Sequence, residues 1–288
     1  MYFDEDVVLE LRLNSLDKYV DYFVIVESEF THKGDKRNLK FNHKKFEKFK
    51  NKIIYLVLDK EPKELQKIID TKNDHGGYIM NALLRENNQR NFISEGLKSA
   101  NDDDFILISD VDEIPNLESI DFRKIKNKIV MFEQNIFYYK LNRYLPNFTW
   151  YGTKACKKKD LITPQWLRNI KNNKYSFLRF DTFFSKKKYI DKFYIKSGGW
   201  HFSNLKNAVD IESKLKSYLH HIDYKYEELG LDKIDYLIKN NKTIYDMFGD
   251  KSSKKFGNEK RKTLEKYDIN KLPKYIKKNL NKYKDWID

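Results

Sequence analysis

The chain has 288 residues, of which 40% are hydrophobic and 15% aromatic, a composition that supports a sizeable core and excludes a largely disordered protein. Its formal net charge of +14 is compatible with nucleic acid, an anionic membrane surface or an anionic substrate as partner. One cysteine excludes an intrachain disulfide. No apolar run approaches the roughly 20 residues needed to span a membrane, and no signal-peptide pattern is present, so we expect a soluble, cytoplasmic protein.

Helical and strand-like segments alternate over the first 141 residues. Val7, Leu11 and Leu16 lie on one face of a helix predicted over 4–20. Strands are predicted at 22–26, 53–58, 104–109 and 129–141, and helices at 43–50, 61–69 and 78–100. This alternation predicts an α/β fold with a mainly parallel sheet flanked by helices, and ligands bind such sheets at the carboxyl ends of the strands.

The pattern becomes helical after about residue 205, with helices predicted over 207–221, 226–241 and 270–283. From Lys251 to Asp288 there are thirteen Lys or Arg and five Asp or Glu, so this part is strongly basic. We therefore expect an α/β domain over 1–205 and a helical, basic portion over 206–288 that packs on it. The lysine clusters at 157–159 and 186–188 form either a solvated face or a surface that attracts an anionic acceptor or a membrane.

The segment 105–115 is the most informative of the chain, because a buried strand is followed at once by Asp110, Asp112 and Glu113. Three carboxylates at one strand end are costly unless a positive charge lies beside them. Carboxylate oxygens suit Mg²⁺ or Mn²⁺, and a metal held in this way binds the diphosphate of a nucleotide. The alternative is an ordinary turn rich in helix-capping acids.

Five segments, taken in order along the chain, resemble glycosyltransferase family 17, the β-1,4-mannosyl-glycoprotein 4-β-N-acetylglucosaminyltransferase-like proteins, including bacterial and viral members. They are Glu27-Ser28-Glu29-Phe30-Thr31, Gln89-Arg90-Asn91, Asp110-Val111-Asp112-Glu113-Ile114-Pro115, Trp150-Tyr151-Gly152-Thr153 and Gly198-Gly199-Trp200-His201-Phe202. The resemblance covers nearly the whole chain. It implies a GT-A-like fold, a UDP-sugar donor, a divalent metal and inversion at the anomeric carbon. The family has a short strand before the segment that matches Tyr2, whereas this chain begins at Met1.

The resemblance also implies which residues bind the cofactors. Asp110, Asp112 and His201 are expected to hold Mn²⁺ or Mg²⁺, with Asp110 also reaching the donor, UDP-N-acetylglucosamine. The other residues expected at the donor are Glu27, Thr31, Arg90 and Trp200. Three of them have a structural alternative: Glu27 caps a loop, Arg90 forms an i,i+4 pair with Glu86, and Trp200 belongs to the core.

An inverting transfer needs a base that takes the proton of the acceptor hydroxyl. Asp181 is the first candidate for this catalytic role, and Glu133 and Asp223 are weaker ones. Glu113 is also placed with the catalytic residues, where it either orients the residues that contact the metal or caps a turn.

The sequence thus predicts a metal-dependent inverting glycosyltransferase that moves N-acetylglucosamine from a UDP-sugar to a hydroxyl of a protein-, lipid- or polysaccharide-linked glycan. Two other hypotheses stay open. A non-catalytic basic module that binds nucleic acid or anionic glycans is suggested by the charge of +14, although a nucleic-acid partner is not favoured. A decayed transferase is suggested by the lack of the family's leading strand.

Overall fold

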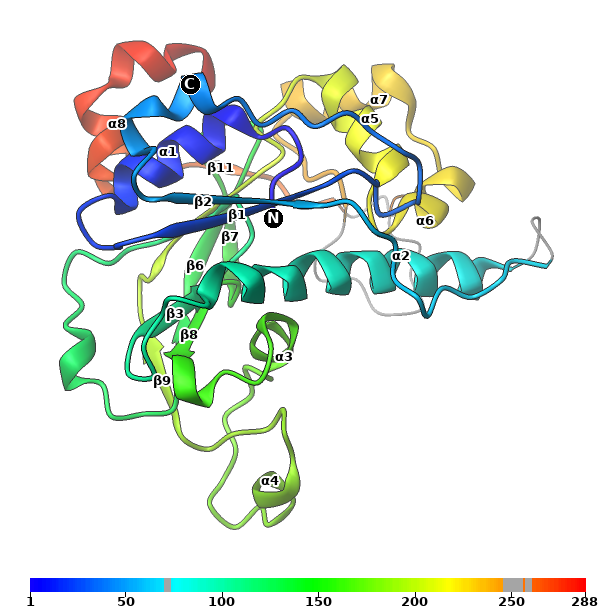
Figure 1. Ribbon diagram of the computed structural model, residues 1–288. Helices are drawn as coiled ribbons and strands as arrows, with labels where there is room; N and C mark the ends of the chain where they lie inside the picture. The colour runs from blue at the N-terminus through cyan, green and yellow to red at the C-terminus, as the bar shows by residue number, and fades with distance from the viewer. Residues whose placement is uncertain (70–73, 246–255, 257–260) are drawn as a thin grey trace.

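The structure is a computed structural model that describes residues 1–69, 74–245, 256 and 261–288 (Figure 1). Part of the basic C-terminal stretch, residues 251–255 and 257–260, therefore lies outside the described residues. Helices flank three sheets, which confirms the α/β class. A mainly parallel sheet is not confirmed: within the described ranges three strand pairs are parallel and five are antiparallel.

The first sheet contains β1 (Phe23–Ser28) and β2 (Ile53–Leu58), paired in parallel with Phe23 opposite Ile53. Both strands lie close to their predicted positions. The second sheet has the order β3-β8-β5-β9, formed by β3 (Phe105–Ile108), β8 (Lys154–Lys157), β5 (Ile129–Phe132) and β9 (Lys192–Ile195). The third has the order β11-β7-β6-β10-β4, formed by β11 (Glu265–Lys266), β7 (Arg143–Trp150), β6 (Gln134–Tyr138), β10 (Gly199–Ser203) and β4 (Glu113–Pro115).

The strand predicted over 129–141 is divided in the structure into β5 and β6, which belong to different sheets. The division occurs at Glu133, whose backbone N–H donates to the carbonyl of Ile195 at 3.0 Å and whose carbonyl accepts from Gly198 at 2.7 Å. Because both flanking segments are apolar and favour strands, the sequence pattern does not reveal this break.

Most predicted helices are present with shorter bounds. They are α1 (Asp6–Leu16), α2 (His75–Asn91), α5 (Ala208–Ser217), α6 (His221–Tyr226), α7 (Gly230–Lys239) and α8 (Lys274–Lys278), with short α3 (Pro164–Asn169) and α4 (Asp181–Phe184). The 3₁₀ segments are His43–Phe49, Phe92–Leu97, Phe122–Lys124, Lys158–Asp160, Ile269–Lys271 and Leu280–Trp286. Nowhere in the described part of the chain is a helix long and apolar enough to cross a membrane.

The helix predicted over 61–69 is wrong, since these residues form neither helix nor strand. Their backbone bonds to α2 instead: the side chain of Asn81 accepts from Gln66 N at 2.7 Å and donates to its carbonyl at 2.8 Å. A tertiary contact therefore replaces the intrahelical bonds that the local pattern favours.

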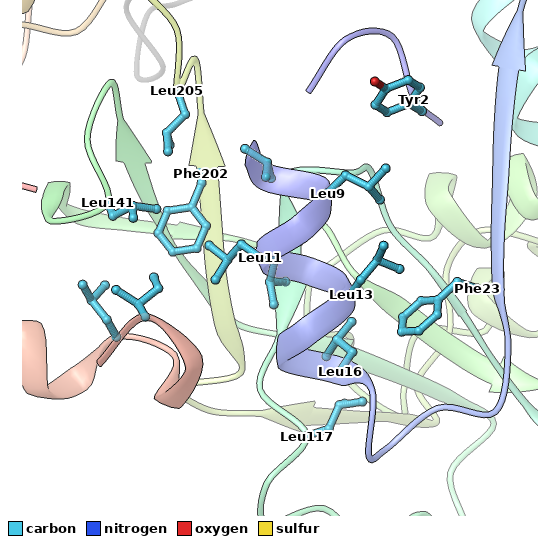
Figure 2. Packing of buried hydrophobic residues seen from close by; sticks show 14 of the residues in the cluster. Tyr2, Leu9, Leu11, Leu13, Leu16, Phe23, Leu117, Leu141, Phe202 and Leu205 are labelled. Atoms are coloured by element: carbon cyan, nitrogen blue, oxygen red, sulfur yellow. The ribbon is translucent and has the colours of Figure 1, made fainter. Parts of the chain in front are cut away.

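Helix α1 lies at the centre of the largest hydrophobic core (Figure 2). Its Leu9 and Leu11 are both buried, and the cluster includes Phe23 of β1 and Phe202 of β10. Three residues of the C-terminal part join the same cluster: Leu272, Ile276 and Tyr283. Together with the pairing of β11 on β7, this shows that the C-terminal part packs on the α/β core, while the division at residue 205 stays a prediction.

A cavity of about 830 Å³ lies between β1 and β3. Its walls include Val24 of β1 and Ile106 of β3, and Arg12 and Ser109 line it beside the loop that follows β3. Within the described residues, β1 pairs along its length with β2 and β3 with β8, so no strand ladder joins the two sheets at this place.

Gly199 allows β10 to approach β4. Its φ is +134°, and a Cβ placed there would lie 2.2 Å from the carbonyl oxygen of Ile114. We expect Gly199→Ala to lower the free energy of unfolding by at least about 2 kcal/mol, because it adds backbone strain and a clash. Urea unfolding followed by circular dichroism measures this change.

The matched control is Gly76→Ala in the first turn of α2, where an added Cβ meets no atom within 4 Å. This variant should be neutral or more stable by up to about 1 kcal/mol, because alanine restricts the unfolded chain. Equal stabilities of the two variants would contradict the close approach of β10 to β4.

Candidate functional site

The acidic turn, residues 109–112, connects β3 to β4. Strand β10 pairs antiparallel with β4 and places His201 opposite Glu113, and the N–H of Phe202 donates to the carbonyl of Asp112 at 2.8 Å. This register brings the Nε2 of His201 to 3.3 Å from the Oδ2 of Asp112. Two residues that lie 89 positions apart are therefore joined by strand pairing.

Two arginines bind the carboxylate of Asp110. Arg90 of α2 lies 3.1 Å from Oδ1, and Arg168 of α3 lies 2.7 Å from Oδ2. Burial would raise the pKa of Asp110, but Arg168 and Arg90 outweigh it and hold the pKa well below its ordinary value. Arg90 also pairs with Glu86 at 2.8 Å, as the structural alternative for this residue expects, while its contact with the donor stays a prediction.

Glu113 is fully buried and has all its partners within the protein. Arg168 donates to both of its carboxylate oxygens, at 2.6 and 2.8 Å, and the indole N–H of Trp150 donates at 2.6 Å. Its Oε2 also accepts from the backbone N–H of Asp110 at 3.0 Å, which closes the turn. A Cβ on Gly152 would lie 2.1 Å from this carboxylate, so glycine is required there.

Arg12 connects the core helix α1 to the acidic turn. It donates to the Oγ of Ser109 at 2.6 Å and to the carbonyls of Asp110 and Glu113. Burial lowers the pKa of Arg12 to about 10, although the charge of Glu113 opposes this shift. The hydrophobic packing of α1 therefore fixes a cation under the turn.

Asp112 differs from its neighbours, because its side chain faces His201 rather than an arginine. Burial raises the pKa of Asp112 and lowers that of His201, yet their mutual attraction dominates and shifts both pKa values in favour of the ion pair. Burial alone would lower the pKa of Lys214 on α5, but the negative charge of Asp112 and other acidic groups outweighs burial, so the pKa is raised above its ordinary value. The Nδ1 of His201 is buried without a hydrogen-bond partner in the described structure.

The expected metal site of Asp110, Asp112 and His201 is brought together only in part. No group of three or more His, Cys, Asp or Glu side chains within the described ranges is arranged to hold a metal. The reason is that Asp110 turns to Arg90 and Arg168. Asp112 and His201 remain as one carboxylate and one imidazole, a pair that fits Mn²⁺ or Mg²⁺ when substrate phosphates supply further oxygens.

Glu27 lies in a separate buried cluster at the end of β1. Its carboxylate pairs with Arg37 at 2.9 Å, accepts from the phenol of Tyr55 at 2.8 Å and accepts from the backbone of Lys40 and Phe41. The structure thus places Glu27 as a clamp on the loop that follows β1, in line with the structural alternative. Thr31 closes the turn in this loop, since its hydroxyl accepts from the N–H groups of residues 34 and 35.

The other predicted residues have hydrogen-bond or ion-pair partners outside the acidic turn. The indole of Trp200 donates to the carbonyl of Lys271 at 3.1 Å. Asp181 is exposed on α4, where hydrogen bonds from Arg179 and Lys188 hold its pKa well below the ordinary value, a poor property for a base. The weaker candidates also have partners: Glu133 accepts from Tyr151 at 3.2 Å, and Asp223 lies 2.8 Å from His220.

Three of the cations around the turn were not predicted from the sequence, whereas Arg90 was. Arg12, Arg168 and Lys214 lie on three different helices, and no local motif marks them. Trp150 and Gly152 belong to one of the five segments singled out above, and their contacts with Glu113 give that segment a physical role. Four of the five segments thus meet around residues 110–113.

The sequence profile described as Glycosyltransferase family 17 matches residues 1–287. The chain belongs to this family. The curated relatives include the β-1,4-mannosyl-glycoprotein 4-β-N-acetylglucosaminyltransferases of Homo sapiens and Rattus norvegicus, each 32% identical over 122 residues, and that of Mus musculus, 31% identical over the same length. The matched part is 41% of this chain and 21% of each relative, so the chain aligns with about a fifth of their length. No solved structure matches the chain significantly.

Membership of family 17 agrees with the resemblance found from the five segments. Because the family consists of glycosyltransferases by its description, the acidic turn and the cations around it become the candidate site for a glycosyl donor. A GT-A-like arrangement is not confirmed by the mixed sheets.

Arg168→Met should lower the free energy of unfolding by about 3–5 kcal/mol, because it leaves the buried Glu113 and the partly buried Asp110 without their shared cation. The control is Arg179→Met, which removes a pair with the exposed Asp181 and should leave the free energy of unfolding nearly unchanged, because solvent screens exposed ion pairs. Urea unfolding of both variants checks the prediction, and equal losses would contradict the shared role of Arg168.

Lys154 holds the end of α3, since its ammonium donates to the carbonyls of Arg168 and Ile170. Burial, with Arg168 adding to it, lowers the pKa of Lys154 to about 7 from 10.5. The unfolded chain therefore binds more protons between these two values, so this group makes stability rise as pH increases from about 7 to 10.5.

Lys154→Met should consequently show a smaller rise in stability with pH than the parent chain. Melting temperatures of both proteins at neutral and at mildly alkaline pH measure the difference in slope. Equal slopes of melting temperature against pH in the two proteins would show that burial does not lower the pKa of Lys154.

Proposed function

We propose that this chain is a UDP-sugar-dependent glycosyltransferase that transfers N-acetylglucosamine, with inversion, to a hydroxyl of a glycan. Family membership supports the general class of reaction, and the printed names of the curated relatives support the sugar. The same names suggest a mannose-containing acceptor, but the aligned part is only 21% of those proteins, and the acceptor stays a proposal.

The observation that carries this proposal is the difference between the three carboxylates of residues 110–113. Asp110 and Glu113 are neutralised by arginines inside the protein, whereas Asp112 faces His201. A carboxylate and an imidazole kept close together, with cations behind them, suit a ligand that combines a metal with a diphosphate.

In this proposal Asp112 and His201 would hold Mn²⁺ or Mg²⁺, which supplies Lewis-acid stabilisation of the diphosphate when bound. His201 ligates only as the neutral imidazole. Because Asp112 raises the pKa of His201, protons compete with the metal for this imidazole, and metal binding should strengthen as pH rises.

The chain's own residues then act on the departing nucleotide. Negative charge develops on UDP when the glycosidic bond breaks, and Lys214, which interacts with Asp112, is the cation that we assign to this charge. Arg90 and Arg168 are paired with Asp110 and Glu113, so we assign them to holding the turn in place before the reaction. Glu113 orients Arg168 and has its carboxylate fully engaged, so we assign it a positioning role rather than proton transfer. Asp181, Glu133 and Asp223 stay predictions for the base.

The test is release of UDP by the purified chain with Mn²⁺ and a panel of UDP-sugars, among which UDP-N-acetylglucosamine should be preferred. Asp112→Asn should lower the rate by about 100-fold or more, because it weakens stabilisation of charge on the leaving group. Asp103→Asn is the control, since Asp103 is exposed and pairs with Lys157 and Lys159, and its rate should stay within about twofold of the parent.

Binding gives a second readout that does not depend on turnover. UDP with Mn²⁺ should raise the melting temperature of the parent chain, and a ligand at 100 times its Kd adds about 2.7 kcal/mol to the stability of the native state. Asp112→Asn should lose most of this shift. If no UDP-sugar is consumed and no shift occurs, the proposal fails; a shift without consumption points to a donor-binding protein that has lost catalysis.

A further inference from the structure

A basic and apolar extension, residues 171–191, projects from the body of the protein between α3 and β9 (Figure 1). Its base is fixed by hydrogen bonds: Lys171 N donates to the carbonyl of Lys187 at 2.9 Å, and the indole of Trp166 donates to that of Lys186 at 2.6 Å. The ammonium of Lys192 adds a further bond to the carbonyl of Lys171 at 2.8 Å. We call this segment the α4 extension.

The tip of the α4 extension is strongly apolar. Five large hydrophobic side chains there have between 64% and 90% of their surface exposed: Phe177, Leu178, Phe180, Phe183 and Phe184. Phe180, Phe183 and Phe184 follow the i, i+3, i+4 spacing that places side chains on one face of a helical turn. Contiguous exposed apolar surface of this kind marks a place of interaction rather than ordinary surface.

The same segment is strongly basic. Residues 171–191 contain six Lys or Arg and two Asp. Asp181 is occupied by Arg179 and Lys188, and Asp191 accepts from Asn127 and from the backbone of residue 128. The exposed phenylalanines therefore lie on a segment with a net charge of +4.

We propose that the α4 extension docks this protein on an anionic lipid membrane, with the phenylalanines of its tip inserted among the lipids and its lysines at the headgroups. Aromatic side chains next to lysines are the combination that binds the interface of an anionic bilayer. The charge complementarity selects an anionic lipid surface over a neutral one.

The position of the α4 extension agrees with this role. It follows directly after α3, whose Arg168 binds Asp110 and Glu113, so the membrane-binding tip and the candidate site are joined by a short, hydrogen-bonded segment. Figure 1 places α4 at the end of the molecule opposite to α8, so docking through this tip leaves the rest of the protein in solvent.

Flotation of the purified chain with lipid vesicles tests the proposal. We expect binding to phosphatidylcholine vesicles that contain phosphatidylglycerol and little binding to phosphatidylcholine alone, with affinity falling as salt increases. The combined change Lys174→Gln, Lys186→Gln and Lys187→Gln should weaken binding by roughly 100-fold, since each lysine near an anionic surface contributes about a factor of five.

The apolar contribution is tested by Phe180→Ser, Phe183→Ser and Phe184→Ser in one variant, which should weaken binding at least about tenfold. The matched control changes three exposed apolar side chains elsewhere, Tyr22→Ser, Ile162→Ser and Val209→Ser, and should bind like the parent chain. Melting temperatures confirm that each variant is folded.

A fluorescent reporter measures insertion in an otherwise intact protein. Phe184→Trp should gain fluorescence that is shifted to the blue by anionic vesicles and quenched by brominated lipid, whereas Tyr22→Trp should show neither effect. Absence of vesicle binding, or equal binding of the control and phenylalanine variants, would overturn the proposal. Binding that depends on lysines alone, or that is directed to a protein instead of lipid, would overturn it as well. UDP release measured without vesicles separates these outcomes from a failure of the proposed enzymatic function.

Discussion

The buried ion pair between Arg168 and two carboxylates is the interaction on which the candidate site depends. Arg168 binds the fully buried Glu113 and also binds Asp110, which forms a second ion pair with Arg90. Because a buried charge is tolerated only when it is paired, none of these groups can lose its partner without a large penalty. The pairing therefore fixes α2, α3 and the acidic turn relative to one another and leaves Asp112 as the carboxylate turned toward His201.

The location of the site could be predicted from the sequence, but its charge balance could not. A buried strand that ends in carboxylates indicates a site at the sheet edge, and Asp110, Asp112 and His201 do lie around one turn. The same reasoning required a positive charge beside these carboxylates and assigned that charge to a metal ion. The structure places Arg12, Arg90 and Arg168 beside these carboxylates. Arg90 was expected near the donor, but the long-range contacts of Arg12 and Arg168 leave no local pattern in a sequence.

The fold shows the same division between local and long-range information. The strands at 53–58 and 104–109 are recognised from their apolar runs, because the apolar character of a strand is a local property of its side chains. Strand direction and the break at Glu133 depend on which backbone groups meet in space, so the mainly parallel sheet was not confirmed. The helix expected over 61–69 failed for a related reason, since Asn81 takes the backbone bonds of Gln66.

The cavity between β1 and β3 has a consequence for the motions of the molecule. Since no ladder of backbone hydrogen bonds crosses it within the described residues, the β1–β2 sheet is attached to the rest of the protein through side-chain packing and through contacts such as that of Gln89 with the carbonyl of Val26. Packing contacts of this kind separate at a lower free energy than a continuous sheet. Fluctuations should therefore concentrate along this seam, so that the loop clamped by Glu27 moves as one unit with its sheet while the acidic turn stays in place.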